Sequence, residues 1–233
     1  MNCPNLSERL LKAADLVPVC DTFLDVGTDH AYLPVYLIKN GICKKAIASD
    51  LRKGPLESAE KTARMYGVLN ETDLRLGSGF ETVKKGEAQA AVVAGMGGIL
   101  IAELIKTSED VVRSLDTLIL QPMTAVFELR KFLYENDFSI TEEHLVKEDE
   151  KLYHIFKVSS GKDIPMTEAE LFMGKKLLEN RDKYFHEYTN RQFDKIIKQI
   201  DGLLKSERDE SVKTLEEKKK LLEELKILTE RKD

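Results

Sequence analysis

The sequence predicts an α/β fold in which helices cover a parallel sheet and a separate helical region follows. Short apolar runs alternate with helical ones from residue 6 to residue 160, which is typical of parallel strands joined by crossover helices. One run, residues 89–94, is nearly all apolar, as expected for a strand buried on both faces. After residue 161 the β-like runs stop, and apolar residues recur at helical spacing instead.

The first part of the chain contains the expected sheet. Strands are expected at residues 23–26, 46–49, 73–76, 89–94, 117–120, 140–146 and 153–158. Helices are expected at residues 31–39, 55–66, 98–106 and 125–135. Pro122 is expected to stop the fifth strand. The last two strands are joined by a short charged turn and should be antiparallel, because a parallel pair needs a long crossover. Five parallel strands with a closing hairpin match the Rossmann-like sheet of class I methyltransferases.

The second part of the chain is expected to be helical, with a domain boundary between residues 1–160 and 161–233. Thr167-Glu168-Ala169-Glu170 has the pattern of a capping box, which begins a helix. Two long apolar stripes follow, separated by a polar break at residues 206–211. Such helices are expected to pair as a C-terminal coiled-coil hairpin. The hairpin could bind a substrate or serve only to form dimers.

Composition limits the function classes. The 233 residues are 42% hydrophobic and 33% charged, with a net charge of −5, which is unlike the general basicity of many nucleic-acid binders. An RNA partner would therefore need a local basic face. The three cysteines form no CxxC pair and favour a reduced cytoplasm. No apolar run is long enough for a membrane span, and the charged N-terminal residues do not resemble a secretory signal.

The most informative motif is Asp25-Val26-Gly27-Thr28-Asp29-His30-Ala31, at the end of the first expected strand. Gly27 permits a sharp turn and the close approach of a ligand, and the following helix offers free N–H groups. However, the dinucleotide fingerprint needs three glycines to seat a pyrophosphate, and Asp29 stands where the second would lie. A carboxylate there suits a cofactor that carries positive charge. S-adenosylmethionine, with its sulfonium and ammonium groups, is such a cofactor.

Further candidates follow the other strands, because ligands of open α/β sheets bind at the carboxyl ends of the strands. Asp50 can accept hydrogen bonds from both ribose hydroxyls, and Leu51 follows it. Gly77-Ser78-Gly79 would pass beside the adenine ring. The three glycines of Gly95-Met96-Gly97-Gly98 have little expected structural value at the exit of a buried strand, so they indicate a ligand or substrate close by.

The chain resembles the TrmK family, the bacterial tRNA adenine-N1 methyltransferases that methylate adenine 22. The resemblance lies in four stretches, which are residues 25–34 with their Asp-His-Ala-Tyr-Leu-Pro word, Gly54-Pro55, Ala94–Gly98, and Leu118–Pro122. The Ser7-Glu8-Arg9-Leu10 segment is similar too. Two positions differ from the family pattern. Ser78 stands in place of an aspartate and Met123 in place of an asparagine.

The resemblance implies a methyltransferase that transfers a methyl group from S-adenosylmethionine to N1 of an adenine in tRNA. Asp29 is the candidate catalytic residue, which would stabilise the charge that develops on the methylated ring. The expected cofactor-binding residues are Asp25, Gly27, Thr28, His30, Asp50, Leu51, Gly77, Ser78, Gly79, Gly95 and Met96. The expected substrate-binding residues are Arg9, Gly97, Gln121 and Pro122, and no metal site is expected.

Basic residues are candidates for contacts with tRNA phosphates, and the protein is expected to be a monomer or a weak dimer. The candidates are Arg9, Lys12, Arg52, Lys53, Lys44, Lys45, Lys195, Lys198 and residues 218–220. Two other functions stay open. One is a methyltransferase for a small molecule or protein, with a dimerising coiled coil. The other is a non-catalytic RNA-binding module.

Overall fold

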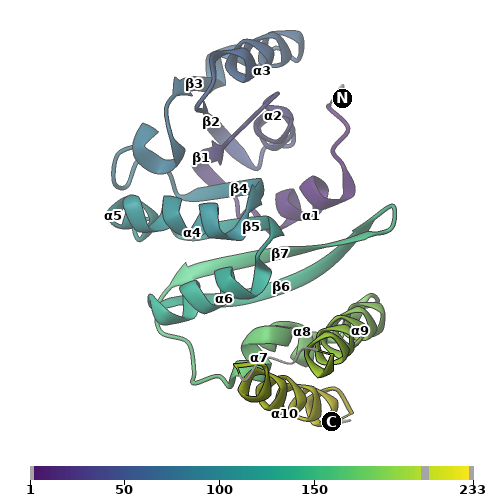
Figure 1. The fold of residues 1–233 in the computed structure, drawn as a ribbon. Coiled ribbons are helices and arrows are strands. Elements are labelled where there is room, and N and C mark those ends of the chain that lie inside the picture. The colour runs from purple at the N-terminus through teal and green to yellow at the C-terminus, as the bar shows by residue number, and fades with distance from the viewer. Residues whose placement is uncertain (1–2, 206–209, 231–233) are drawn as a thin grey trace. The chain divides into compact units, whose positions relative to one another are not determined.

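The computed structural model describes residues 3–205 and 210–230, and the chain divides into two compact units after Asp163. The first unit contains one seven-stranded sheet, with the strand order β3-β2-β1-β4-β5-β7-β6 (Figure 1). Its strands are β1 (Cys20–Val26), β2 (Cys43–Asp50), β3 (Thr72–Leu76), β4 (Ala90–Gly97), β5 (Thr117–Thr124), β6 (Phe138–Glu148) and β7 (Lys151–Ser160).

The predicted pairing of the strands is confirmed. Strands β1 to β5 are parallel to one another, and β7 pairs antiparallel with both β5 and β6. The tight turn between β6 and β7 contains Asp149 with a φ of 51°, a left-handed conformation that aspartate tolerates better than most residues. The unit thus has the Rossmann-like sheet with a closing hairpin that the sequence predicts.

Helices cover both faces of the sheet. One face carries α4 (Gly98–Thr107), α5 (Glu109–Val112) and α6 (Val126–Glu135). The other carries α1 (Glu8–Leu16) and α2 (Tyr32–Lys39), and α3 (Lys53–Met65) packs against α2 and the strands β2 and β3. Short 3-10 turns, η1 (Leu69–Glu71) and η2 (Gly79–Thr82), flank β3.

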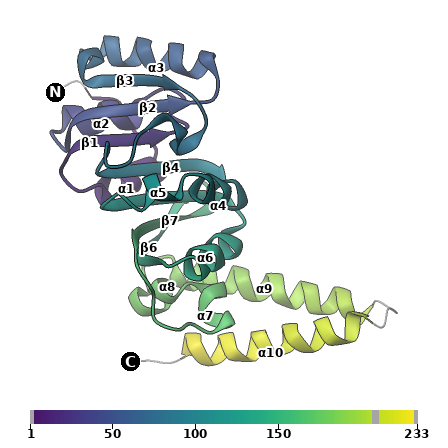
Figure 2. The same ribbon diagram turned by 90° about the vertical axis from the view of Figure 1, so that its left-hand side faces the viewer.

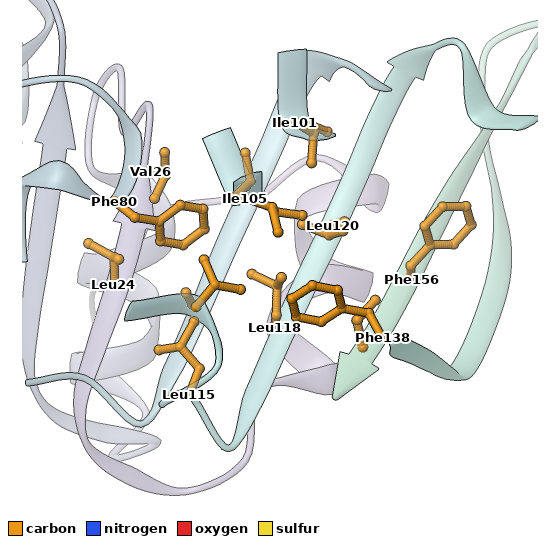
Figure 3. Close-up of a cluster of buried hydrophobic side chains, with 14 of the residues drawn as sticks. Leu24, Val26, Phe80, Ile101, Ile105, Leu115, Leu118, Leu120, Phe138 and Phe156 are labelled. Atoms are coloured by element: carbon orange, nitrogen blue, oxygen red, sulfur yellow. The ribbon is translucent and has the colours of Figure 1, made fainter. Parts of the chain in front are cut away.

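Alternate residues of each central strand supply the two hydrophobic cores, since strand side chains point to opposite faces in turn. Leu118 and Leu120 of β5 join the core beneath α4 and α6, whereas Ile119 joins the core beneath α1 and α2. In the first core, Ile101 and Ile105 of α4 lie over Leu120 and its neighbours (Figure 3). This packing on both faces explains why the central strands read as continuous apolar runs.

The predicted ends of β4 and β5 are wrong, and two helices of the first unit, α1 and α5, were not foreseen. Strand β4 extends to Gly97 and β5 to Thr124, so Pro122 does not stop β5. Met96 pairs with Pro122 between two register shifts, and such irregularities are where a strand accommodates a proline. Of these, α1 buries Ala13, Ala14 and Leu16, and the four-residue α5 buries Val112.

The second unit contains four described helices, α7 (Glu168–Met173), α8 (Lys175–Asn180), α9 (Phe185–Leu204) and α10 (Glu210–Glu230). The predicted capping box is confirmed, because Thr167 and Glu170 exchange hydrogen bonds at the start of α7. The prediction of one continuous first helix is wrong. The backbone breaks at Gly174 (φ 93°) and Arg181 (φ 43°), and these breaks separate α7, α8 and α9.

Helices α9 and α10 lie side by side (Figure 2). Ile196, Ile200, Leu221 and Leu225 are buried in this unit. Ile197, Leu204 and Val212, which the predicted apolar stripes include, are exposed. Regular coiled-coil packing remains a prediction, and part of the predicted polar break, residues 206–209, lies outside the described residues. Across the described parts of both units, no helix has the length and apolar character to cross a bilayer.

Candidate functional site

A cavity of about 640 Å³ opens in the first unit where β1 and β4 end. The strand order reverses between these two strands, and open α/β sheets bind ligands at such a point. The lining residues are Asn5, Leu6, Ser7, Arg9, Leu10, Asp25, Gly27, Thr28, Asp29, His30, Tyr32, Leu33, Asp50, Arg52, Ala94, Gly95 and Met96.

Two buried carboxylates form the acidic side of the cavity. Asp25 ends β1 and is 6% exposed, and Asp50 ends β2 and is 8% exposed. Burial raises the pKa of Asp25 from its ordinary 3.8 to about 7; the Thr28 hydroxyl opposes this shift and the charge of Asp50 adds to it. A bound cation would stabilise the ionised form of Asp25, and so offset both the cost of burying its charge and the repulsion from Asp50.

The loop after β1 is tightly held and has unusual backbone angles. The amides of Gly27 and Thr28 both donate to the Ser49 carbonyl, at 2.8 and 2.9 Å. Gly27, Asp29 and Ala31 have φ values of 75°, 50° and 55°. Non-glycine residues with such angles cluster at functional sites, where the surrounding structure maintains them. The φ of Gly27 favours glycine, and a Cβ there would also require the terminal methyl group of Met96 to move.

Asp29 and His30 project from this loop at the open part of the cavity. The Asp29 side chain is 68% exposed, and its Oδ2 lies 3.6 Å from Nε2 of His30. The His30 ring stacks on Tyr32 with centroids 5.4 Å apart. An exposed carboxylate beside two stacked rings can contact a planar, partly cationic ligand.

Arg9 of α1 forms the basic side of the cavity, and three neighbours hold it. Its Nη1 donates to Oε1 of Gln121 at 2.9 Å, its Nε lies 3.4 Å from Oε2 of Glu148, and its guanidinium lies 6.0 Å from the centre of the Tyr153 ring. The Arg9 backbone amide also donates to Glu148, at 2.7 Å. Helix α1 therefore carries a cation in a fixed position.

Nine of the predicted site residues line this cavity. They are Arg9, Asp25, Gly27, Thr28, Asp29, His30, Asp50, Gly95 and Met96. Seven do not line it, namely Leu51, Gly77, Ser78, Gly79, Gly97, Gln121 and Pro122. Gly77 still lies next to the acidic side, because its amide donates to the Asp50 carbonyl at 3.0 Å. Leu51 is 69% exposed.

Gln121 lies behind the cavity wall and is fully buried. Its Oε1 accepts hydrogen bonds from Arg9 and from the Gly95 amide at 3.0 Å, and its Nε2 donates to the Pro122 carbonyl at 3.1 Å. With these bonds made, the side chain connects α1, β4 and β5 and has little capacity left for a ligand.

Two glycines at the junction of β4 and α4, Gly95 and Gly98, are required by the backbone, which the sequence did not indicate. A Cβ on Gly98 would collide with the Ala125 carbonyl oxygen and lie 2.9 Å from that of Thr124. Gly95 has a φ of 78°, which favours glycine in any case. The expectation that these glycines have little structural value is therefore wrong for these two positions.

The main omission from the predicted site is the wall formed by the N-terminal segment. Asn5, Leu6, Ser7 and Leu10 line the cavity although they lie far in sequence from the strand ends. Ser7 immediately precedes α1, and its position before an apolar helical run was a usable signal. Tyr32, Leu33 and Ala94 also line the cavity within motifs already recognised.

The cavity fits a cationic nucleoside cofactor better than a dinucleotide. Buried Asp25, at the end of β1, would repel a pyrophosphate, and the β1 loop contains one glycine instead of the three that seat a pyrophosphate. Asp50 stands at the end of β2, where a carboxylate binds ribose hydroxyls in Rossmann-like folds. Within residues 3–205 and 210–230, no group of three or more His, Cys, Asp or Glu side chains is arranged to hold a metal ion.

Comparisons with known proteins agree with this geometry. Residues 6–156 match the family model of a methyltransferase domain. The tRNA (adenine(22)-N(1))-methyltransferase of Bacillus subtilis (strain 168) is 37% identical over 161 residues, which are 69% of this chain and 68% of that protein.

Two solved structures resemble the whole chain. The crystal structure of the B. subtilis M1A22 tRNA methyltransferase TrmK has a TM-score of 0.88 at 29% identity, covering 97% of this chain and 99% of that one. The Streptococcus pneumoniae protein Sp1610, in complex with S-adenosyl-L-methionine, has a TM-score of 0.81 at 29% identity, covering 94% and 100%. The chain therefore belongs to the methyltransferase-domain family and, within it, to the family of the tRNA (adenine(22)-N(1))-methyltransferases.

Proposed function

We propose that this protein transfers a methyl group from S-adenosylmethionine to N1 of an adenine in tRNA, at the position 22 named for the Bacillus relative. The observation that carries this proposal is the acidic, glycine-poor cavity at the reversal of the strand order. The buried carboxylate of Asp25, beside a loop with one glycine, favours a sulfonium cofactor over one with a pyrophosphate.

The cofactor would be held by the residues around β1 and β2. Asp50 is suited to accept the ribose hydroxyls, and Asp25 to face the positively charged part of the cofactor. Gly27, Thr28, His30, Gly95 and Met96 would complete the site, with Leu51 and residues 77–79 near the adenine. When bound, S-adenosylmethionine supplies an electrophilic methyl group, so the protein needs no covalent nucleophile.

The protein's own contribution to the reaction is alignment and the removal of water from the reacting atoms. The target adenine must leave its stack for its Watson–Crick edge to enter the cavity, at a cost of a few kcal/mol. The exposed carboxylate of Asp29 would stabilise the positive charge that develops on the adenine ring, or accept a proton from its N6 amine. The stacked rings of His30 and Tyr32 offer a surface for a planar base.

The tRNA would reach the cavity along basic side chains of the first unit. Arg52 lines the cavity with a side chain that is 76% exposed. Lys53 follows Arg52 in the sequence, and Lys12 lies three residues after Arg9, which also lines the cavity. Exposed lysines of the second unit, such as Lys195 and Lys198, would contact further phosphates. A tRNA substrate and the three free cysteines favour the cytoplasm, and the protein would act as a monomer or a weak dimer.

The direct test is incubation of the protein with unmodified tRNA and S-adenosylmethionine that carries a labelled methyl group. We expect the label in 1-methyladenosine at position 22 after nuclease digestion and mass spectrometry. A tRNA with guanine at that position is the matched control and should remain unlabelled. Label in protein or metabolite mixtures instead of tRNA would support a different substrate. The absence of cofactor binding by calorimetry would support a non-catalytic RNA-binding module.

A further inference from the structure

Three large apolar side chains are exposed where β4 and β5 lead into helices. Ile99 and Leu100, in the first turn of α4, are 58% and 46% exposed, and Met123, near the end of β5, is 41% exposed. The buried isoleucines of α4, Ile101 and Ile105, point into the core instead (Figure 3). The core therefore does not account for the exposed set, which we call the apolar rim (Ile99, Leu100 and Met123).

The backbones that carry the apolar rim lie in contact with each other. Gly97 of β4 pairs with Thr124 of β5, and a Cβ on Gly98 would lie 2.9 Å from the Thr124 carbonyl oxygen. Ile99 follows this contact on one segment, and Met123 precedes it on the other. The rim thus comes from one small region of the surface, unlike the single exposed apolar residues that are common on any protein.

The apolar rim borders the cavity. Met96 lines the cavity and pairs with Pro122, the residue before Met123. The Met123 sulfur lies 3.5 Å from Nε2 of Gln121, whose Oε1 accepts a hydrogen bond from the Gly95 amide at the cavity wall. A molecule too large for the cavity that places one part at the end of β4 would therefore have its neighbouring parts close to the rim.

The charge around the rim favours an uncharged partner surface. Residues 95–105 and 118–129 contain no lysine or arginine, and Glu103 of α4 and Glu128 of α6 are exposed. These carboxylates oppose a phosphate group, whereas the flat face of a nucleobase is uncharged and stacks on apolar groups. Isoleucine, leucine and methionine side chains serve as wedges between the bases of bent DNA.

We propose that the apolar rim takes the place of the target adenine in the base stack when that adenine enters the cavity. The inference rests on the proposed function, because it takes tRNA as the substrate. Unstacking a base costs free energy and leaves the neighbouring base without a partner. Contact of that base with Ile99 and Leu100 would offset part of this cost, with Met123 as the adjoining support. The rim residues are thus positioning residues, because they contact the RNA beside the reacting base.

Replacement of the target adenine by the fluorescent base 2-aminopurine tests this step without turnover. Its emission rises when the base leaves the stack, and S-adenosylhomocysteine fills the cofactor site without a methyl group to transfer. We expect the emission to rise when the wild type binds this tRNA, and Ile99→Ala/Leu100→Ala to lose most of that rise. With unmodified tRNA and S-adenosylmethionine, this variant should lower kcat/KM by about 10- to 100-fold, as for the loss of a stacking contact with a base.

Two matched variants serve as controls. Ile99→Leu/Leu100→Met keeps the apolar volume and should retain the emission rise. Val19→Ala/Met65→Ala removes two exposed apolar side chains that do not line the cavity and should behave like the wild type. Alanine is favourable in a helix, so Ile99→Ala/Leu100→Ala should stay folded and keep the wild-type affinity for S-adenosylmethionine in calorimetry.

Three results would overturn the inference. One is a wild-type emission rise and kcat/KM in Ile99→Ala/Leu100→Ala. Another is a loss of affinity for S-adenosylmethionine by the same factor as kcat/KM, since the rim would then support the cavity itself. The third is a change in sedimentation with no effect on tRNA, which would assign the rim to association between copies of the chain.

The methylation assay separates this inference from the proposed function. If the wild type labels adenine 22 and Ile99→Ala/Leu100→Ala labels it equally fast, this inference fails alone. If the wild type labels no tRNA, the proposed function fails and this inference fails with it.

Discussion

The side chain with the largest consequences at the residue scale is Asp25, a buried acid whose pKa is raised to about 7, chiefly by burial. In the unfolded chain its pKa returns to an ordinary value near 4. Between these values the folded state holds the proton more strongly, so the free energy of unfolding should fall as the pH rises from about 4 to 7 and then level off. The expected loss is on the order of 2–4 kcal/mol.

Urea unfolding at pH 5 and pH 8 measures this loss. Asp25→Asn cannot ionise, so its stability should fall less over the same interval. Asp15→Asn, at an exposed position of α1, should behave like the wild type. The raised pKa of Asp25 is ruled out as the cause if Asp25→Asn and the wild type lose stability equally.

Asp29 belongs to the same loop but has the opposite surroundings, because its side chain is 68% exposed. If it stabilises the developing charge of the adenine, Asp29→Asn should lower kcat by about 10²- to 10³-fold and leave the affinity for S-adenosylmethionine within about threefold. Asparagine tolerates the φ of 50° at this position, so the loop should keep its conformation.

Asp149→Asn is the matched control for this substitution. Asp149 has nearly the same backbone angle, a φ of 51°, in the turn between β6 and β7, and it does not line the cavity. The kcat of Asp149→Asn should equal that of the wild type in a steady-state assay with tRNA. Unchanged turnover in Asp29→Asn would remove Asp29 from the mechanism.

At the scale of elements, the end of β4 must lie very close to the start of α6. Gly98 is the first residue of α4, and its Cα faces the carbonyl groups of Thr124 and Ala125. Gly98→Ala would force these backbones apart, and we expect a loss of about 1–3 kcal/mol in the free energy of unfolding.

Gly54, near the start of α3, has nothing within 4 Å of the position of a Cβ. Gly54→Ala should therefore be neutral or stabilise by about 0.4–1 kcal/mol in the same urea titration. Equal effects of the two substitutions would contradict this account of the packing.

The sequence predicts the existence of the sheet elements better than their ends. Residues 89–94 and 117–120 are recognisable as strands because their side chains must fill two cores. The continuation of both strands depends on pairing between residues that are distant in the sequence, such as Met96 and Pro122. A proline normally indicates the end of a central strand, but here it lies between two register shifts of the β4–β5 pair and beyond the last residue of β5 that pairs with β7.

On the scale of the whole molecule, local motifs indicated Asp25, Asp50 and Arg9 but not the neighbours that hold Arg9 in place. Residues 25–31 are informative alone, because a glycine and two acids at a strand end have few other uses. The setting of Arg9 arises only when α1 lies against β5, β6 and β7. Its neighbours Gln121 and Glu148 are more than a hundred residues away. Helix periodicity cannot indicate such a contact.

The second unit is where the proposed RNA contacts and the proposed chemistry can be tested separately. Lys195 and Lys198 of α9 are both exposed, and one helical turn separates them. If they contact tRNA phosphates, Lys195→Gln/Lys198→Gln should weaken tRNA binding and reduce its salt dependence by up to about one unit of log–log slope per lost contact. The affinity for S-adenosylmethionine should not change. Filter binding of tRNA between 50 and 200 mM salt, roughly the range over which phosphate contacts are strongly screened, measures the slope.

The matched control changes the same number of lysines in the first unit, away from the cavity. Lys84 and Lys85 are exposed residues that do not line it, and Lys84→Gln/Lys85→Gln should retain the wild-type slope. Sedimentation of both variants distinguishes the other role that the sequence leaves open for these helices. If Lys195→Gln/Lys198→Gln binds tRNA with the wild-type slope but sediments differently from the wild type, the second unit serves association between copies of the chain, and the tRNA phosphates must be met elsewhere.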